Sequence, residues 1–208
     1  MKKLKIKVCG MKEQDEVDSL CESNLIDYIG FIFYSKSPRF IVDTPSTSNV
    51  KRVGVFVNEE LETILKRIDT HQLDIVQLHG DESVEDVKSL KGMSNVQLVK
   101  VIGVDESTEF KDFREYEMYI DFYLFDTKSS KYGGTGRLFD WEVLKKYKGE
   151  VPFFLSGGLN EESIFNIETD LHPKLVGIDL NSGFELTPGK KDTRKIIETL
   201  KKLKSYGN

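Results

Sequence analysis

A lone carboxylate at the end of an apolar run leads into a glycine-rich loop and offers the clearest chemistry in the sequence. The run Phe122 to Phe125 is apolar and aromatic, as a buried strand should be, so Asp126 falls where that strand meets solvent. The loop that follows contains Gly133, Gly134 and Gly136, which would let the backbone turn tightly, approach a ligand or close as a lid. We predict that Asp126 is available for proton transfer, the alternative being an ordinary surface loop.

Other polar side chains lie at the ends of further predicted strands. If the strands close into a parallel barrel, their carboxyl ends form the active site. The residues expected there are Cys9, Arg39, Gln77, His79, Asp126, Ser156 and Asp179. Because residues two apart on a strand share a face, Lys7 points into the barrel if Cys9 does. A lysine in that position needs a carboxylate partner, and we expect Asp179 to provide it.

Two glycine-containing turns could bind a phosphate group. Gly157 and Gly158 precede a predicted helix, and Ser182 and Gly183 follow the last predicted strand. Backbone amides without side chains in the way are good donors to an anion, although paired glycines are often needed only for tight turning. Since both turns follow the last two strands, where barrels commonly bind phosphate, we predict a phosphorylated small-molecule ligand.

Apolar runs alternate with helical patterns along the whole chain. Strands are predicted at Lys5 to Val8, Tyr28 to Phe33, Val53 to Val57, Ile75 to Leu78, Val96 to Ile102, Phe122 to Phe125, Phe153 to Leu155 and Val176 to Leu180. Eight strands, each followed by a helix or a connection of helix length, predict an α/β fold with a single (β/α)8 barrel domain over residues 1–208. An open doubly wound sheet is the alternative, but no Gly-x-Gly-x-x-Gly follows the first strand.

Local signals refine this assignment. Asn58-Glu59-Glu60 is predicted to start the helix that carries Leu61, Ile64, Leu65 and Ile68, and Asn160 is expected to cap the helix after the seventh strand. Weaker helices are expected over about Ser107 to Tyr116 and around Trp141 to Tyr147. The stretch from Phe40 to Arg52 contains proline and several serines and makes a poor helix, so the second helix should be shortened or missing.

Composition excludes several classes of function. The 208 residues carry 31% charged side chains of both signs and a formal net charge of -5, without a long basic run, which argues against nucleic-acid binding. No apolar run has the length of a signal peptide or a membrane span, so we expect a cytoplasmic protein without a membrane partner. Cys9 and Cys21 are then free thiols, and the three histidines lack the spacing of a metal site.

Seven sequence blocks, in this order, resemble the phosphoribosylanthranilate isomerases of tryptophan biosynthesis. They are Lys7-Val8-Cys9-Gly10-Met11; Gly30-Phe31-Ile32-Phe33 with Ser37-Pro38-Arg39; Val53-Gly54-Val55-Phe56-Val57-Asn58; Gln77-Leu78-His79-Gly80; Gly133-Gly134-Thr135-Gly136 with Asp140-Trp141; Ser156-Gly157-Gly158-Leu159; and Asp179-Leu180-Asn181-Ser182-Gly183-Phe184-Glu185 with Gly189-Lys190-Lys191-Asp192. The resemblance implies a single-domain barrel that catalyses an Amadori rearrangement of N-(5'-phosphoribosyl)anthranilate without a cofactor or a metal.

The resemblance also implies roles for individual residues. Asp126 would be the acid that opens the sugar ring, and Cys9 the base that removes the proton from C2'. Arg39 would meet the anthranilate carboxylate, and Asp179 would lie near the sugar hydroxyls. Ser156 and Asn181 depart from the alanine and serine that are usual in the family. Gln77 and His79 are left without a catalytic role.

Two other functions remain open from the sequence. Another phosphosugar isomerase or synthase on the same fold would share the phosphate turns, but a paired-aspartate enzyme would have Asp in place of Cys9. A catalytically silent barrel that only binds phosphate is opposed by the presence of an acid, a base and anion-binding residues. The connection from Phe40 to Arg52 is shorter than the family leads us to expect and too polar for an obligate interface, so we expect a monomer.

Overall fold

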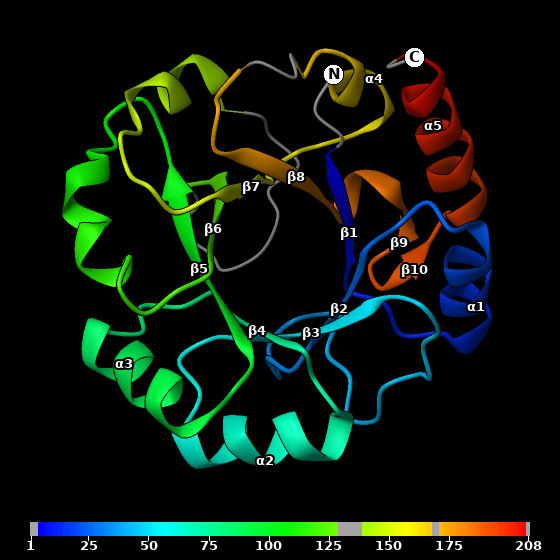
Figure 1. The fold of residues 1–208 in the computed structure, drawn as a ribbon. Helices are drawn as coiled ribbons and strands as arrows, with labels where there is room; N and C mark the ends of the chain where they lie inside the picture. Colours follow the sequence, from blue (N-terminus) through cyan, green and yellow to red (C-terminus); the bar gives the residue numbers. More distant parts are fainter. Residues whose placement is uncertain (1–3, 129–138, 168–170, 207–208) are drawn as a thin grey trace.

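The computed structural model describes residues 4–128, 139–167 and 171–206. Within them, eight parallel strands pair in chain order and close into a barrel, with helices around its outside (Figure 1). The strands are β1 (Lys5–Cys9), β2 (Tyr28–Ile32), β3 (Lys51–Phe56), β4 (Ile75–Leu78), β5 (Gln97–Val104), β6 (Phe122–Thr127), β7 (Phe153–Leu155) and β8 (Leu175–Leu180). The barrel closes between β1 and β8, where Lys7 is in register with Asp179. The predicted α/β barrel is confirmed.

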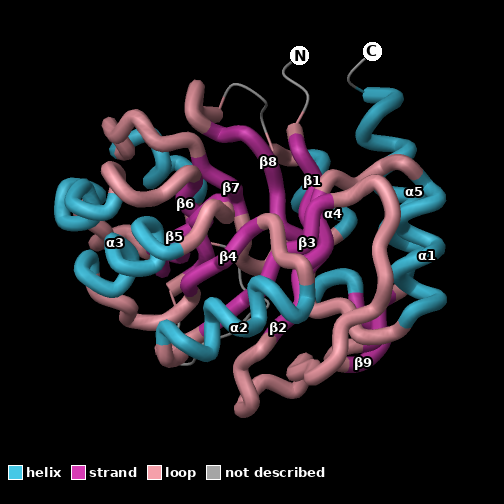
Figure 2. The backbone as a smooth tube through the Cα atoms, turned by 60° about the horizontal axis from the view of Figure 1, so that its bottom comes forward, coloured by secondary structure: helices cyan, strands magenta, loops and turns pink. Residues whose placement is uncertain are grey.

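The helices surround the strands, with α1 and α5 lying side by side (Figure 2). The α-helices are α1 (Gln14–Ser23), α2 (Leu61–His71), α3 (Val84–Met93), α4 (Glu161–Phe165) and α5 (Thr193–Tyr206). Three 3₁₀ helices, η1 (Phe110–Tyr116), η2 (Trp141–Lys146) and η3 (Ser182–Phe184), and a small hairpin of β9 (Glu185–Thr187) and β10 (Lys190–Lys191) complete the described elements. None of the described helices is both long and apolar enough to span a membrane.

The predicted helix boundaries are partly confirmed. Asn160 caps α4 by accepting hydrogen bonds from the backbone of Glu162 and Ser163. The prediction around Asn58 was wrong in detail, because α2 begins at Leu61 with Glu60 in the capping position. Asn58 instead adopts a left-handed conformation with φ of 49°, and its backbone N–H donates to Glu82. A tertiary contact therefore replaces the local cap.

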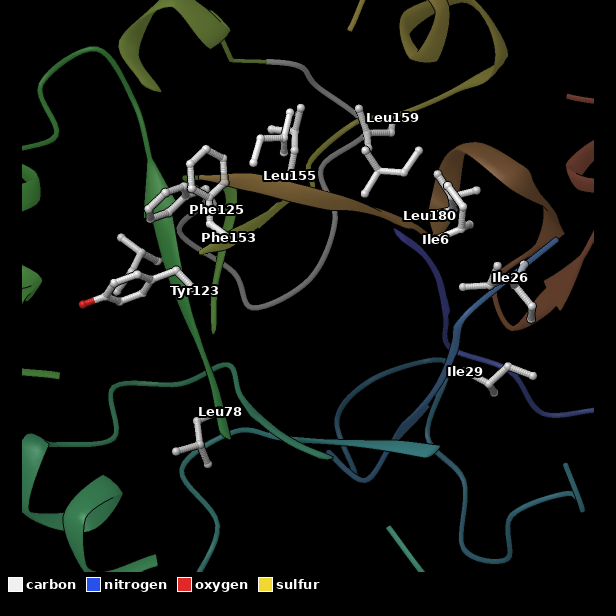
Figure 3. Close-up of a cluster of buried hydrophobic side chains, with 14 of the residues drawn as sticks. Ile6, Ile26, Ile29, Leu78, Tyr123, Phe125, Phe153, Leu155, Leu159 and Leu180 are labelled. Atoms are coloured by element: carbon white, nitrogen blue, oxygen red, sulfur yellow. The ribbon is translucent and has the colours of Figure 1, made fainter. Parts of the chain in front are cut away.

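Alternation along the strands produces two apolar layers. The outer layer packs strands against helices and includes Ile29, Leu78, Phe125, Phe153 and Leu180 (Figure 3). A smaller inner cluster is formed by Tyr28, Val53, Ile75, Val99, Val101, Leu124 and Phe154. Val53 on β3 is in register with Ile75 on β4, and inner side chains such as these fill the barrel as a packed floor. The polar residues nearer the strand ends lie on this floor.

The second connection contains no helix, as the sequence predicts. Arg52 at the start of β3 fastens this segment to the barrel: its guanidinium donates to Thr44 Oγ1, to Pro45 O at 2.9 Å and to His71 O at the end of α2 at 2.8 Å. The same group lies 5.0 Å from the centre of the Phe31 ring. One side chain thus covers part of the sheet that a helix would otherwise cover.

We expect Arg52→Met to loosen this connection. The substitution removes the donors to these three acceptors and to Thr47 Oγ1, which should lower the free energy of unfolding by roughly 1 to 3 kcal/mol and speed amide exchange between Ile41 and Val50. Hydrogen exchange followed by mass spectrometry measures both effects. Lys51→Met, at an exposed neighbouring position on β3, is the matched control and should change little. Equal protection of the connection in the two variants would contradict this role.

Candidate active site

The carboxyl ends of the strands surround a cleft that collects the predicted residues. Seven of the eight predicted site residues line it, namely Cys9, Arg39, Asp126, Gly157, Gly158, Asp179 and Ser182. Gly183 does not line the cleft, because a β-carbon there would lie 2.1 Å from Leu159 O. The absence of a side chain at Gly183 instead lets the loop after β8 contact the loop after β7. Gln77, His79, Ser156 and Asn181 also line the cleft.

Cys9 lies beside a buried ion pair between β1 and β8, the two strands at which the barrel closes. Lys7 Nζ is 2.8 Å from Asp179 Oδ1, and each side chain is only 5% exposed, which confirms the predicted pairing. Burial lowers the pKa of Lys7, but Asp179 more than compensates and raises it. Burial raises the pKa of Cys9, although Lys7 acts in the opposite direction. Cys9 is therefore a thiol in the free protein at neutral pH. Both cysteines are free thiols, as predicted.

Asp126 faces the cleft from β6 with 13% of its side chain exposed. Its Oδ1 accepts a hydrogen bond from Thr127 N at 2.7 Å, and its Oδ2 lies 3.7 Å from His79 Nε2. Burial raises the pKa of Asp126 to about 6, in spite of the hydrogen bond from Thr127. This carboxyl group can hold a proton close to neutral pH, which suits a general acid.

Arg39 is held by a carboxylate that the sequence does not single out. Its Nε and Nη2 donate to Glu185 at 2.9 and 2.6 Å, and Lys191 Nζ lies 2.6 Å from the same carboxylate. Burial opposes ionisation of Glu185, but Arg39 and Lys191 lower its pKa to about 2. Glu185 occupies the edge of the guanidinium that carries Nε and one proton of Nη2. The other edge, which carries Nη1 and the second proton of Nη2, can bind a ligand carboxylate.

The turn after β7 requires its two glycines. Gly157 and Gly158 have φ angles of 89° and 66°, which other residues rarely adopt. A β-carbon on Gly157 would lie 2.3 Å from Thr127 Oγ1 and 2.9 Å from Asp126 Oδ1. The glycine therefore lets this turn approach the carboxylate closely. Ser182 is the first residue of η3 and lines the same cleft, on the loop that Gly183 packs against Leu159.

The two departures from the family pattern are accommodated in the cleft wall. Ser156 is buried at the end of β7, and its backbone N–H donates to Phe125 O. Asn181 Oδ1 accepts a hydrogen bond from Lys191 Nζ at 2.7 Å and so joins the Arg39 and Glu185 group. The predicted glycine loop with Gly133, Gly134 and Gly136 lies outside the described residues. Among the residues described, no group of three or more His, Cys, Asp or Glu is placed to hold a metal ion.

Comparison with known proteins identifies one family. Residues 6–202 match the model of N-(5'-phosphoribosyl)anthranilate (PRA) isomerase. The protein of that name from Parabacteroides distasonis is 42% identical over 199 residues, covering 92% of this chain and 89% of that protein. The crystal structure of phosphoribosyl anthranilate isomerase from Thermotoga maritima has a TM-score of 0.82 and 33% identity, with 98% and 100% of the two chains covered.

Two further structures extend this comparison. A phosphoribosyl anthranilate isomerase in complex with reduced 1-(o-carboxyphenylamino)-1-deoxyribulose 5-phosphate is 31% identical, with a TM-score of 0.79 and coverage of 98% and 100%. A structure of monomers generated from the dimeric Thermotoga maritima enzyme is 33% identical, with a TM-score of 0.80 and the same coverage.

We expect inorganic phosphate or sulfate to bind between the Gly157-Gly158 turn and Ser182. Crystals grown from these salts should show the anion there, held by backbone N–H groups. Ser182→Asp places a negative charge in the cradle and should weaken phosphate binding roughly tenfold or more, as titration calorimetry would show. Ser37→Asp adds the same charge to the lining of the cleft after β2, outside the proposed cradle, and is the control. An anion bound only elsewhere on the rim would contradict the assignment.

Proposed function

The chain belongs to the N-(5'-phosphoribosyl)anthranilate isomerase family, and from this premise we propose how its residues carry out the reaction. The protein is an isomerase of tryptophan biosynthesis that converts N-(5'-phosphoribosyl)anthranilate to 1-(2-carboxyphenylamino)-1-deoxyribulose 5-phosphate. The observation that best supports the assignment of residues is that a buried carboxyl group with a pKa of about 6 and a buried thiol face the same cleft.

Asp126 acts as the general acid. Ring opening requires a proton on the furanose ring oxygen, after which the C1'–O bond breaks and the nitrogen lone pair forms an iminium. Burial keeps Asp126 protonated to higher pH than an exposed aspartate, so a larger fraction of the molecules carries the proton when the substrate binds near neutral pH. Oδ1 is held by Thr127 N, which leaves Oδ2 as the oxygen that delivers the proton.

Cys9 acts as the general base. The proton on C2' becomes acidic once the iminium has formed, and its removal gives the enolamine that tautomerises to the product. Cys9 is a thiol at rest, but a cationic iminium in the cleft favours the thiolate, as Lys7 also does. The base therefore becomes active together with the substrate cation that it must deprotonate.

The remaining residues orient the substrate between them. Arg39 holds the anthranilate carboxylate with its open edge, while Gly157, Gly158 and Ser182 form the phosphate cradle on the β7 and β8 side, and Gly183 packs the Ser182 loop against Leu159. Asp179 lies between Cys9 and the cradle and is close enough to the cleft to meet a sugar hydroxyl. The reaction as proposed uses no cofactor or metal.

The assembly and location of the protein are also part of this proposal. It acts as a single domain over residues 1–208, as a monomer, and in the cytoplasm. Large apolar side chains with more than half of their surface exposed in the described region are Val42, Met93, Met118 and Leu186, which lie on four different segments of the chain. Sedimentation equilibrium should give the mass of one chain, and a stable dimer would contradict this expectation.

We expect Cys9→Ala to lower turnover roughly 10²- to 10⁴-fold while the fold and substrate binding persist, because the side chain supplies proton transfer and little buried area. Loss of the fluorescence of phosphoribosylanthranilate measures the reaction. Asp126→Asn should fail in ring opening yet still bind the reduced, open-chain product analogue. Cys21→Ala, at a buried cysteine on α1, is the control and should stay active. Near wild-type turnover in Cys9→Ala would exclude Cys9 as the base.

We expect Arg39→Met to raise KM more than it lowers kcat, because the guanidinium holds the same carboxylate before and during the reaction. Inhibition by the reduced product analogue provides a second measurement. An analogue without the benzoate carboxylate should bind the variant and the wild type equally. If Arg39→Met weakened both analogues by the same factor, Arg39 would not be the carboxylate partner.

A further inference from the structure

Gln77, His79 and Asp126 are aligned across the mouth of the barrel. Gln77 is buried on β4, and its Nε2 lies 3.3 Å from Nδ1 of His79, which follows the strand. The other ring nitrogen, Nε2, lies 3.7 Å from Asp126 Oδ2. That separation is longer than a hydrogen bond, and contacts of this kind commonly shorten once substrate fills the site.

The amide of Gln77 determines which ring nitrogen of His79 carries the proton. An amide –NH2 group can donate but cannot accept, so Nδ1 of the ring must be the acceptor in this contact. The proton of the neutral ring is then on Nε2, which faces Asp126 Oδ2. His79 therefore directs an N–H group at the oxygen of Asp126 that delivers the proton.

The surroundings of His79 keep the ring uncharged. Burial, together with the nearby ammonium groups of Lys7 from β1 and Lys100 from β5, lowers the pKa of His79 to about 4. Asp126 from β6 is the carboxylate that faces the ring. A charged imidazolium would hold Asp126 in its ionised form and remove the proton needed for ring opening. A neutral ring avoids this effect while still offering a hydrogen-bond donor.

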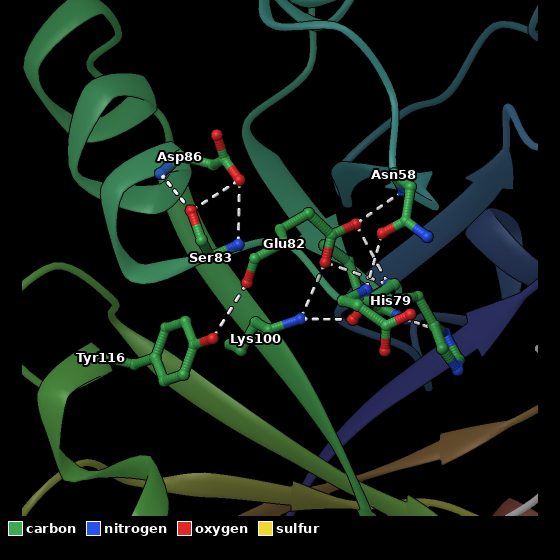
Figure 4. Close-up of polar contacts among 10 residues, drawn as sticks. Asn58, His79, Glu82, Ser83, Asp86, Lys100 and Tyr116 are labelled. Atoms are coloured by element: carbon green, nitrogen blue, oxygen red, sulfur yellow. Dashed lines mark hydrogen bonds and ion pairs between the residues drawn. The ribbon is translucent and has the colours of Figure 1, made fainter.

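A second buried ion pair fixes the turn that carries His79 (Figure 4). Lys100 Nζ lies 2.7 Å from Glu82 Oε2 and donates to Gly80 O at 2.6 Å. Glu82 in turn accepts from the backbone N–H groups of Gly80 and Asn58. The residue after His79 is thus held through both its N–H and its C=O, so the ring is directed by its backbone as well as by Gln77.

We propose that His79 is a positioning residue for Asp126: its Nε2–H, oriented by Gln77, donates a hydrogen bond to Oδ2 as that oxygen loses its proton to the sugar. This inference rests on the proposed function, in which Asp126 is the acid. In the step, the proton moves from Oδ2 to the ring oxygen, and the electron pair of the broken O–H bond stays on Oδ2. His79 keeps its own proton and stabilises the new carboxylate.

The protonation state of the ring can be measured without activity. The ¹⁵N shifts of His79 in the free protein should show a neutral ring with the proton on Nε2, unchanged as the pH falls to about 5, since its pKa is about 4. Gln77→Leu should mix the two tautomers. A proton on Nδ1 would mean that Gln77 presents its oxygen to the ring, and this would overturn the proposal.

The effect on Asp126 provides the second test. ¹³C titration of its carboxyl group should give a pKa near 6 in the wild type and a higher value in His79→Leu, because the charged form loses a donor. His79→Gln carries a neutral amide donor at about the position of Nε2 and should restore the wild-type value. The pKa of Asp126 in these variants does not depend on whether phosphoribosylanthranilate is the substrate. The inference about His79 can therefore fail while the proposed function holds, and the proposed function can fail while the inference holds.

Kinetics connect the same variants to the reaction. Since the active form needs protonated Asp126 and ionised Cys9, kcat/KM of the wild type should rise with pH, bend near pH 6 and then stay level until Cys9 titrates. Below the bend, where Asp126 is protonated in every variant, His79→Leu should lower kcat roughly 10- to 100-fold with little change in KM. The bend should move to higher pH, and His79→Gln should reverse both changes.

A matched control separates this role from general loosening. Tyr116 OH donates to Glu82 O at 2.9 Å, so Tyr116→Phe disturbs the same buried group without reaching the ring. It should leave both the bend and the pKa of Asp126 in place. If Tyr116→Phe moved them as far as His79→Leu does, or if His79→Leu and His79→Gln behaved alike, His79 would have only a structural role.

Discussion

The ion pair between Lys7 and Asp179 is the interaction on which the site depends. It crosses the seam between β1 and β8, where the barrel closes, and both partners lie in the same register of the sheet. Placing two charges in a packed interior is costly, and their mutual attraction offsets this cost only when the geometry is close, as the separation of 2.8 Å is here. Removing either partner would leave the other charge buried beside Cys9. The contact that closes the barrel between β1 and β8 therefore also sets the electrostatic environment of the base.

Buried carboxylates also hold the other cations around the barrel mouth, with a consequence for the chemistry. Glu82 neutralises Lys100 near His79, and Glu185 is shared by Arg39 and Lys191 at the edge of the cleft, which leaves one positive charge there for a ligand carboxylate. The fixed charges are thereby held by carboxylates, whereas the groups that move or direct protons are neutral or easily protonated: Cys9 is a thiol, His79 a neutral ring, and Asp126 has a pKa of about 6. The cation formed by ring opening then arises in the same cleft as the neutral thiol of Cys9, and its positive charge promotes ionisation of this base, which the next step requires.

The sequence predicts the parts of this arrangement that depend on periodicity. Alternation placed Lys7 and Cys9 on one face and led to Asp179 as the partner, and the strand ends indicated most residues of the cleft. It could not reveal that Arg39 is held by a carboxylate 146 residues away, or that Glu82 reaches back to Asn58. Such contacts arise from tertiary packing and leave no local pattern. The Asn58 prediction failed for this reason, since an asparagine before a helix resembles a cap until a distant acceptor is known.

The shortened second connection shows how a barrel can lose a helix and keep its site. Arg39 lies on this connection, in a part of the chain that has only an isolated bridge between Ile32 and Phe40 to continue the sheet. Its position is set instead by Glu185 on β9, which is held in turn by Lys191 and by the backbone of Gly189. The hairpin after β8 thus fixes the position of Arg39 through its side chain, whereas a packed second helix would fix it through the backbone. Because Glu185 binds Arg39 through two parallel hydrogen bonds, it fixes the orientation of the guanidinium as well as the position of the chain. These hydrogen bonds use the Nε edge, so the Nη1 edge stays available for a ligand carboxylate.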